Sequence, residues 1–389
     1  MPALVVTVLY PVSIAILTIL YCSKYIIGTL EIVTAILTYY IANISVGIGL
    51  HRLWAHGAYK PAKFIEFILA ILSAATLQGP ILAWASDHIL HHMHTDKAKD
   101  PHSAAKYKNK FIGFMWSHMG WMLTQESGSK KIAKIALVKL GRNKIVMWQL
   151  KHYWKIAISM NTVFPFLLGY LIGGEFLYGI STFLFFGVGR ALQQQATFCV
   201  NSVVHLGIGS KKYYYGTARD MWWLFFLLLG ENWHNFHHAF ASDYRNGHKW
   251  YHLDAHKWII ALMEKIGLAK DLIITSEVRI KAIADKVGKK FQQDQKIRVK
   301  LDFIEKATLQ IQQSALQKLR AAEKLAQDFK DSLSGIADKT VIILEYVDSL
   351  RQGASDTEEK LIFELSNRYE NLRKSALMLN ISSETIYGA

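Results

Sequence analysis

Cysteine and proline are scarce in this 389-residue chain, which holds two cysteines and six prolines. Cys22 and Cys199 each end an apolar segment, and the topology derived below places those two ends at opposite faces of a bilayer. A disulfide framework is therefore excluded, and cysteine carries no functional signal. No Lys or Arg precedes the first apolar segment, so the basic start of a signal peptide is missing as well.

Acidic residues are in short supply over most of the chain. Residues 1–270 hold 26 basic and 12 acidic residues, whereas residues 271–389 hold 19 and 18. The excess positive charge lies between long apolar blocks, and 51% of all residues are hydrophobic, a profile typical of a membrane protein. The basic segments contain no recognisable nucleic-acid-binding motif, so we expect no nucleic-acid partner.

Four apolar segments are long enough to cross a bilayer as helices. They are residues 4–22, 26–50, 153–172 and 176–200, and their short connections predict two helical hairpins. Residues 51–152 contain 15 Lys or Arg, whereas the two hairpin turns together hold only Lys24. This bias predicts that both termini and the central loop are cytoplasmic.

Two further apolar stretches do not fit a full crossing. Residues 64–84 contain Glu66, Gln78 and a Gly79-Pro80 break, and we interpret them as an in-plane or re-entrant helix. Residues 221–229 are too short to span. The predicted fold is therefore an all-α integral membrane domain over residues 1–275, with four transmembrane helices in two hairpins and a cytoplasmic helical cap.

The composition changes beyond residue 275, where Trp, His, Pro and Cys are absent and Lys, Glu, Asp, Gln and Ala are dense. Residues 276–389 are predicted to form a cytoplasmic α-helical tail, whose role the sequence does not indicate. A short heptad-like apolar stripe runs through Ile297, Leu301, Ile304, Thr308, Ile311 and Ala315. We favour an amphipathic helix packed on its own neighbours over a coiled-coil dimer as its explanation.

Histidines are concentrated just beyond the apolar segments, all on the predicted cytoplasmic side. Two motifs have histidines at positions i, i+3 and i+4, a spacing that puts three imidazoles on one helix face. The candidates are His51 and His56 in "HRLWAH", His88, His91 and His92 in "DHILHH", Asn201 and His205 in "NSVVH", and His234, His237 and His238 in "NWHNFHH". We expect Asn201 and His205 to lie one turn apart on a helix.

Nine imidazoles are more than one metal ion can bind, so two ions are implied. The motifs contain no thiolate and no obvious bridging carboxylate, which argues against structural zinc, calcium and magnesium. Redox-active iron fits an all-imidazole site best, although ligand type alone leaves zinc and copper open.

Taken in order, these motifs resemble those of the membrane-bound fatty acyl desaturases, in particular the acyl-CoA and acyl-lipid delta-9 branch, over about residues 5–272. The likeness includes "WASDHILHH" followed by "DPH", then "WSHMGWM" and "GENWHNFHHAF". The resemblance implies an oxidoreductase with a di-iron centre that uses dioxygen to place a cis double bond at delta-9 of a saturated long-chain acyl group. The acyl carrier would be CoA, a lipid or acyl carrier protein.

The resemblance also implies an external electron donor, such as ferredoxin or cytochrome b5 with its reductase. The tail lacks the "HPGG" of a fused cytochrome b5 domain. Localisation would be multi-pass, in the plasma membrane of a bacterium or the endoplasmic reticulum of a eukaryote.

Roles follow from the resemblance position by position, with no catalytic residue separate from the metal ligands. One iron would bind His51, His56, His88, His92 and His237, and the other His91, His205, His234 and His238, with Asn201 holding a water. The substrate would contact Gln78, Trp84, Asp87 and Thr197. Gly79 and Ser86 depart from the family residues that hold the CoA headgroup, which leaves the acyl carrier open.

Further polar residues are candidates for fixing the imidazole tautomers. They are Asp87, Asp220, Glu231 and Asn235, and for Asp220 and Glu231 a helix cap or a surface salt bridge is the alternative. The remaining histidines are expected to lie outside the site: His94, His102, His118, His152, His248, His252 and His256.

Two other functions stay open at this point. A membrane hydroxylase of the same histidine-rich superfamily would insert oxygen instead of forming a double bond. A non-catalytic membrane protein would bind metal and recruit partners through its tail.

Overall fold

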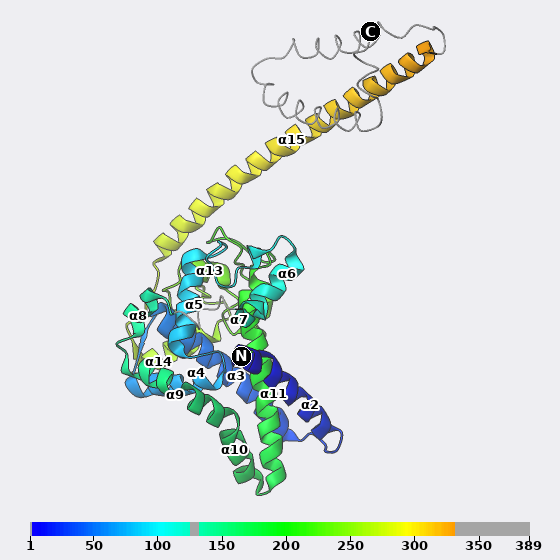
Figure 1. The fold of residues 1–389 in the computed structure, drawn as a ribbon. Coiled ribbons are helices and arrows are strands. Elements are labelled where there is room, and N and C mark those ends of the chain that lie inside the picture. The colour runs from blue at the N-terminus through cyan, green and yellow to red at the C-terminus, as the bar shows by residue number, and fades with distance from the viewer. Residues whose placement is uncertain (1, 125–131, 331–389) are drawn as a thin grey trace. The chain divides into compact units, whose positions relative to one another are not determined.

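The computed structural model describes residues 2–124 and 132–330, and it is almost entirely helical (Figure 1). Contacts divide the chain into a unit of residues 1–289 and a unit of residues 290–389. The first unit contains every predicted metal ligand.

The chain begins with two helical rods, and both pack on the later helix α11 (Phe176–Asn201). The first rod is α1 (Pro2–Leu4), the π-helix η1 (Val5–Leu9) and α2 (Tyr10–Cys22). The second is α3 (Thr29–Ile44) and the π-helix η2 (Ser45–His56). Strand β1 (Lys60–Pro61) then pairs antiparallel with β2 (Ala269–Lys270), which ties the start of the cap to its end.

The central part of the chain consists of helices interrupted by short turns. They are α4 (Lys63–Ala75), α5 (Ile81–His94), the 3-10 helix η3 (Ala104–Lys106), α6 (Lys110–Met115), the π-helix η4 (Trp116–Gly120), α7 (Trp121–Leu123), α8 (Lys134–Leu140), α9 (Lys144–Asn161), α10 (Val163–Gly173) and α11 (Phe176–Asn201). In Figure 1, α10 and α11 form the second hairpin.

The last part of the first unit has less regular structure. It contains the 3-10 helices η6 (Val203–His205) and η7 (Trp222–Leu224), α12 (Phe225–Leu228), α13 (His234–Ala239) and α14 (Ala255–Lys265). Helix α15 (Glu277–Lys330) follows.

Three helical rods in the described residues are long and apolar enough to cross a membrane: Pro2–Cys22, Thr29–His56 and Lys144–Gly173. They cover three of the four predicted spans. Helix α11 covers the fourth and is a continuous helix of 26 residues, but it does not belong to this apolar set. The four-span topology and the cytoplasmic orientation therefore stay predictions.

Residues 64–84 do not form the single helix expected from the sequence. Helix α4 ends at Ala75 and α5 begins at Ile81, with the chain turning between them. Leu77 and Gly79 adopt left-handed backbone conformations, with φ of 56° and 100°, and Pro80 has no N–H for a helix ladder. Gln78 lies within this turn, and Trp84 lies in the first turn of α5.

A second correction concerns Asn201 and His205, which do not share one helix. Helix α11 ends at Asn201, Ser202 breaks it with φ of −113° and ψ of −69°, and His205 ends the separate 3-10 turn η6. The short segment 221–229 is also split, into η7 and α12, and it does not span.

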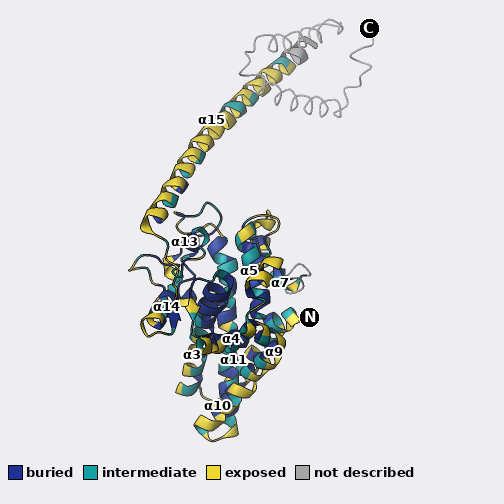
Figure 2. Ribbon diagram, turned by 90° about the vertical axis from the view of Figure 1, so that its left-hand side faces the viewer, coloured by how far each residue is buried: buried dark blue, intermediate teal, exposed yellow. Residues whose placement is uncertain are grey.

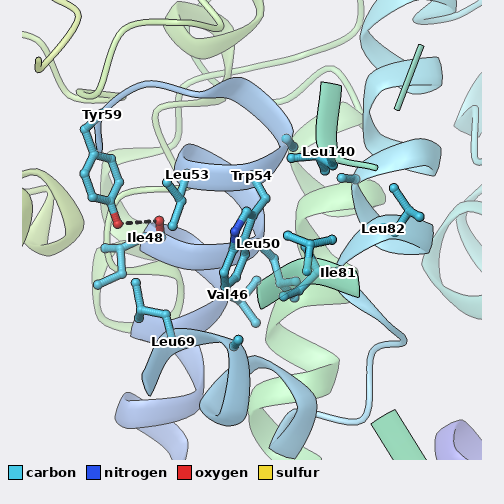
Figure 3. Close-up of a cluster of buried hydrophobic side chains, with 14 of the residues drawn as sticks. Val46, Ile48, Leu50, Leu53, Trp54, Tyr59, Leu69, Ile81, Leu82 and Leu140 are labelled. Atoms are coloured by element: carbon cyan, nitrogen blue, oxygen red, sulfur yellow. Dashed lines mark hydrogen bonds between the residues drawn. The ribbon is translucent and has the colours of Figure 1, made fainter. Parts of the chain in front are cut away.

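The main core lies where η2 meets α4, α5 and α8. Figure 3 shows Trp54 of η2 among Val46, Leu50 and Ile81, and the Tyr59 hydroxyl donates a 2.9 Å hydrogen bond to the carbonyl of Ile48. Each large apolar side chain buried here contributes about 1.5–3 kcal/mol. Figure 2 shows the buried residues gathered in this region, whereas α10 is largely exposed. The histidines of η2 are therefore carried by the best-packed part of the chain.

The base of α15 belongs to the first unit. Ile280 is buried against Tyr213, Phe236 and Phe240, and Phe236 lies on α13 between the metal-ligand candidates. The helix is also attached by an ion pair of 3.0 Å between the Lys249 Nζ and Glu277 Oε2 atoms. The compact unit thus extends past residue 275, where the sequence predicted the domain boundary. Residues 331–389 of the predicted tail lie outside the described residues.

This packing predicts that Ile280→Ala destabilises the metal-carrying unit by about 2–5 kcal/mol, because it leaves a cavity beside Phe236. The measurement is thermal unfolding of the full chain in detergent. Val278→Ala is the matched control, since the Val278 side chain is 81% exposed on the same helix. Equal melting temperatures for the two variants would show that α15 does not support α13.

Candidate metal centre

The first pair of histidines comes from the π-helical turns of η2. A π-helix closes its hydrogen bonds from residue i to i+5, so His51 and His56 fall one turn apart. On an α-helix a spacing of five residues would separate the side chains by about 140°. Here the two imidazole ring centroids lie 4.8 Å apart. Gly57 then ends the helix in a left-handed conformation, with φ of 66°.

The two triplet motifs lie on α-helices, as their spacing predicts. Helix α5 carries His88, His91 and His92, and α13 carries His234, His237 and His238. Helix α13 has only six residues, so it needs outside support.

Polar side chains around α13 provide that support. The Asp220 carboxylate accepts the backbone N–H groups of Asn235 and Phe236 at 2.7 and 3.2 Å, at the start of the helix. The Asn235 amide oxygen accepts backbone N–H groups from the loop at Lys212 and Tyr213. Asp220 and Asn235 therefore fix the helix and its neighbouring loop, and in the described contacts they do not touch a candidate ligand ring.

The structure brings five of the predicted ligands into one group and four into another. The first group is His51, His56, His88, His92 and His237, and the second is His91, His205, His234 and His238. Within each group the candidate ligand atoms all lie within 4.8 Å of one another. These are the same two sets that the resemblance assigns to the two irons.

The Nε2 atoms face one another in both groups. In the first, Nε2 of His237 lies 2.9 Å from that of His51 and 3.0 Å from that of His92. In the second, Nε2 of His234 lies 3.0 Å from those of His205 and His238. Nitrogens that bind one first-row metal at about 2.1 Å, at right angles, are themselves about 3 Å apart. The spacing therefore fits a metal ion in each group.

The imidazoles are held in the protonation state that metal binding requires. Burial lowers the pKa of His91 to about 3, and it also lowers the pKa of His205 and His238 well below the usual value. The rings are therefore neutral near pH 7, which leaves a nitrogen lone pair available to a metal.

The outward-facing Nδ1 atoms of three candidate ligands meet oxygen atoms. Glu231 Oε2 lies 2.8 Å from the Nδ1 of His51, and Asp100 Oδ1 lies 3.0 Å from that of His91. His205 Nδ1 donates to the Thr217 hydroxyl at 2.7 Å, and Thr217 in turn donates to the carboxylate of Asp96. Such partners fix the tautomer and keep Nε2 pointed at the metal.

Glu231 is the centre of a buried network of charged and polar groups. Its carboxylate is contacted by the Arg52 guanidinium at 3.2 Å and by His256 Nδ1 at 3.1 Å, and it accepts from the Asn246 amide at 2.8 Å. Arg52 also pairs with Asp254 at 3.0 Å. This arrangement makes Glu231 a partner of a candidate ligand and not a surface salt bridge.

Sequence reasoning placed two histidines outside the site that in fact adjoin it. His102 stacks on the candidate ligand His91 with ring centroids 4.3 Å apart, and it forms a third cluster with Asp100. His256 contacts Glu231. Asp100 and His102 belong to the "DPH" motif, which offered a signal, whereas nothing in the sequence singled out Thr217 or His256.

The predicted substrate residues line two cavities that meet beside the first group of ligands. A cavity of about 650 Å³ and one of about 40 Å³ share Trp84, His88, Thr197 and Asn201 in their walls. Asp87 lines the larger cavity only. Asn201 borders both, and its predicted role through a water stays a prediction.

Gln78 connects the residues at this junction. Its side-chain amide accepts from the indole N–H of Trp84 at 3.3 Å and donates to the Thr197 hydroxyl at 3.2 Å. The Trp84 ring also stacks on that of His88, with centroids 5.0 Å apart. The cavity wall is therefore fixed against a candidate metal ligand.

Fold and site together define a class: a helical membrane protein with two adjacent histidine clusters of metal-binding geometry at the wall of a mostly apolar cavity. The chain belongs to the fatty acid desaturase family, whose sequence profile matches residues 29–270.

Several named desaturases are similar to the chain. A probable acyl-CoA desaturase of Schizosaccharomyces pombe is 37% identical over 63% of this chain and 49% of its own length. Acyl-CoA desaturase 1 of Saccharomyces cerevisiae is 34% identical over 60% of this chain and 44% of its own. Delta-9 acyl-lipid desaturase 2 of Arabidopsis thaliana is 32% identical over 64% of this chain and 76% of its own length. The chain thus spans about half the length of the two yeast relatives.

The geometry predicts that His205→Ala lowers metal content by about one ion per chain, because the second group loses one of its four nitrogens while the first stays whole. Metal per protein is measured by mass spectrometry on purified full chain loaded with iron. His152→Ala is the control, since His152 belongs to neither group. Loss of both ions, or of none, would contradict two separate sites.

A second prediction concerns Glu231, where Glu231→Gln removes the negative charge that faces His51 at nearly constant size. We expect metal binding in the first group to weaken about 10–100-fold, which chelator competition measures. Glu277→Gln is the control because that carboxylate pairs only at the surface, with Lys249. An unchanged affinity in Glu231→Gln would reduce Glu231 to a structural role.

Proposed function

We propose that the chain is an oxygen-dependent fatty acyl desaturase that introduces a cis double bond at delta-9 of a saturated acyl chain. It would use a di-iron centre and an external electron donor. The observation that carries the proposal is the junction of the two cavities, because Trp84 and Thr197 border it together with His88, a candidate ligand. An acyl chain lying in the larger cavity would therefore present its methylene groups to the metal site.

The cavity suits an acyl chain in its size and in its walls. A volume of about 650 Å³ lies in the range of small-molecule sites. Its walls are mostly apolar and include Leu77, Ala83, Trp121 and Phe198, although polar residues such as Asp87, His102 and Gln194 also line it. The burial of methylene groups against such walls contributes about 0.8 kcal/mol each.

The proposed reaction removes two hydrogens from adjacent methylenes. It consumes one dioxygen, two electrons from the donor and two protons, and it yields two waters and the double bond. Two bound irons would supply the oxidising chemistry, and the four-nitrogen and five-nitrogen imidazole sets would hold them.

The chain's own residues position the reactants. Gln78 holds Trp84 and Thr197 at the bend, so that one carbon–carbon pair lies nearest the ligands. Glu231, Asp100 and Thr217 keep the ligand imidazoles oriented from behind. The side chains of Glu231 and Asp100 in these contacts are themselves buried.

The partners and location follow from the same proposal. The acyl substrate would be linked to CoA, lipid or acyl carrier protein, and the donor would be ferredoxin or cytochrome b5 with its reductase. The histidines and both termini would face the cytoplasm, as the bias of positive charge predicts.

Two alternatives lead to different products. A hydroxylase would give a hydroxylated acyl chain, and a non-catalytic metal protein would give none. The cavity junction favours an enzyme, because metal binding alone needs no acyl-sized space beside the ligands. The names of the similar proteins favour desaturation over hydroxylation.

The test is expression of the full chain and of His237→Ala in a desaturase-deficient cell, followed by gas chromatography of the fatty acids. Wild type should produce a new delta-9 monounsaturated species, and His237→Ala should reduce it by at least about 100-fold because one ligand of the first group is lost. His152→Ala should behave as wild type. A hydroxylated product would establish the hydroxylase, and no product from wild type would refute the proposal.

A further inference from the structure

The turn between α4 and α5 adopts a backbone conformation that its own residues do not favour. Leu77 has φ of 56°, in the left-handed region that is disfavoured for a residue with a side chain. The turn is also buried, since Thr76 is 0% and Leu77 is 6% exposed. A buried turn of this kind persists only where the surrounding structure holds its backbone groups in place.

Three side chains of α9 bond to backbone groups of the turn. The contacts are Asn161 Nδ2 to the Ala75 carbonyl at 2.9 Å, the Gly79 N–H to the Tyr153 hydroxyl at 2.9 Å, and the Ile81 N–H to Gln149 Oε1 at 3.2 Å. They extend from the end of α4 to the start of α5. Gln149 is 0% and Asn161 is 2% exposed, and neither belongs to the walls of the two cavities. These two side chains therefore act on the turn from behind the cavity wall.

Helix α11 supplies partners for the middle of the turn. The Arg190 guanidinium donates to the Thr76 carbonyl at 3.4 Å, and the Gln194 amide donates to the Leu77 carbonyl at 3.4 Å. Arg190 is 1% exposed, and its positive charge lies at the C-terminal end of α4, where the last carbonyls are partly negative. Charged and polar side chains inside a membrane domain are costly, so their concentration on one turn points to a function for that turn.

The turn carries the residue that connects the two cavities. Gln78 lies within it and bonds to Trp84 and to Thr197 where the cavities meet. Each of residues 75–81 except Pro80 thus bonds to a side chain of α9 or α11. The position of Gln78 is therefore set by α9 and α11, and not by α4 and α5 alone.

We propose that the side chains of α9 and α11 that hold this turn determine which carbon–carbon bond of the acyl chain is desaturated. The inference rests on the proposed desaturase function and assigns Gln149 and Asn161 as positioning residues. The bond that reacts is the one held nearest the candidate ligands. His51 and His237 belong to η2 and α13, so a displaced turn would shift the acyl chain against ligands that stay in place. A shift by one carbon–carbon bond presents the neighbouring bond for reaction.

Gln149→Leu tests one end of the turn, because it removes the acceptor of the Ile81 N–H at nearly constant size. The full chain is expressed in a desaturase-deficient cell, and gas chromatography with mass spectrometry of dimethyl disulfide adducts measures the double-bond position. We expect the share of positional isomers other than the main wild-type product to rise at least about fivefold, because loss of one buried hydrogen bond weakens the preference for one turn conformation by about tenfold.

The share of each isomer separates positioning from stability. Fewer folded molecules lower the total amount of product but leave the proportions of the isomers unchanged. Asn161→Leu tests the other end of the turn, where it removes the donor to the Ala75 carbonyl, and it decides the question if Gln149→Leu does not accumulate in the membrane. We expect it to broaden the isomer distribution in the same way.

Ser181→Ala is the control on α11. Ser181 is 1% exposed and its hydroxyl donates to the Tyr178 carbonyl of its own helix at 3.2 Å, so this variant should keep the wild-type proportions. Wild-type proportions in the product of Gln149→Leu and Asn161→Leu, or an equal change in Ser181→Ala, would overturn the inference and leave the desaturase function standing. Absence of any product from wild type would overturn the proposed function and this inference together.

Discussion

The candidate ligand rings on α5 and α13 have to remain neutral while neighbouring Nε2 atoms lie about 3 Å apart, and the rest of the cap depends on that constraint. Protonated rings at this spacing would repel one another strongly, because the interior screens charge poorly. Burial solves the problem by disfavouring the charged form, and it lowers the pKa of each described ligand on α5 and α13. The same burial favours a partner for each outward-facing nitrogen, and the Nδ1 atoms of His51, His91 and His205 each have one.

Charged side chains lie behind the imidazole rings: Glu231 contacts His51, and Arg52 contacts Glu231. Arg52 is 1% exposed and Asp254 is fully buried, and they pair with each other next to Glu231. A lone buried charge would be costly, whereas this set balances two carboxylates against one guanidinium and the neighbouring donors. Asp254 also accepts the backbone N–H groups of Asn246 and Gly247. The irregular loop before α14 is therefore fixed by side chains in place of regular secondary structure.

Short-range patterns could be predicted from the sequence because helix geometry alone determines them. The spacing in "DHILHH" and "NWHNFHH" is enough to place three rings on one face of α5 and of α13. The π-helical turn that aligns His51 with His56 has no comparable sequence signal, and neither does the break at Ser202. These features are set by contacts across the fold, such as the pairing of His51 with His237, 186 residues away.

The same distinction explains why Thr217, His256 and the base of α15 escaped prediction. Each acts through a partner that is remote in sequence, and none has a periodic neighbour that would mark it. Composition changes near residue 275, where charged residues become dense, but Ile280 still packs against Phe236. A boundary in composition is therefore not a boundary in packing, because Ile280, Ile283 and Ala284 pack the start of α15 into the cap.

Polar residues on helix α11 lower the hydropathy by which a membrane-spanning helix is recognised. Gln193, Thr197 and Asn201 recur every four residues along one face, and the last two line the cavities. Arg190, on the same helix, is 1% exposed and donates to the carbonyl of Thr76. Polar groups in a membrane protein are tolerated where they face its interior, and they lower the hydropathy of the helix that carries them. The absence of α11 from the apolar set is therefore the expected result for a helix that lines both cavities.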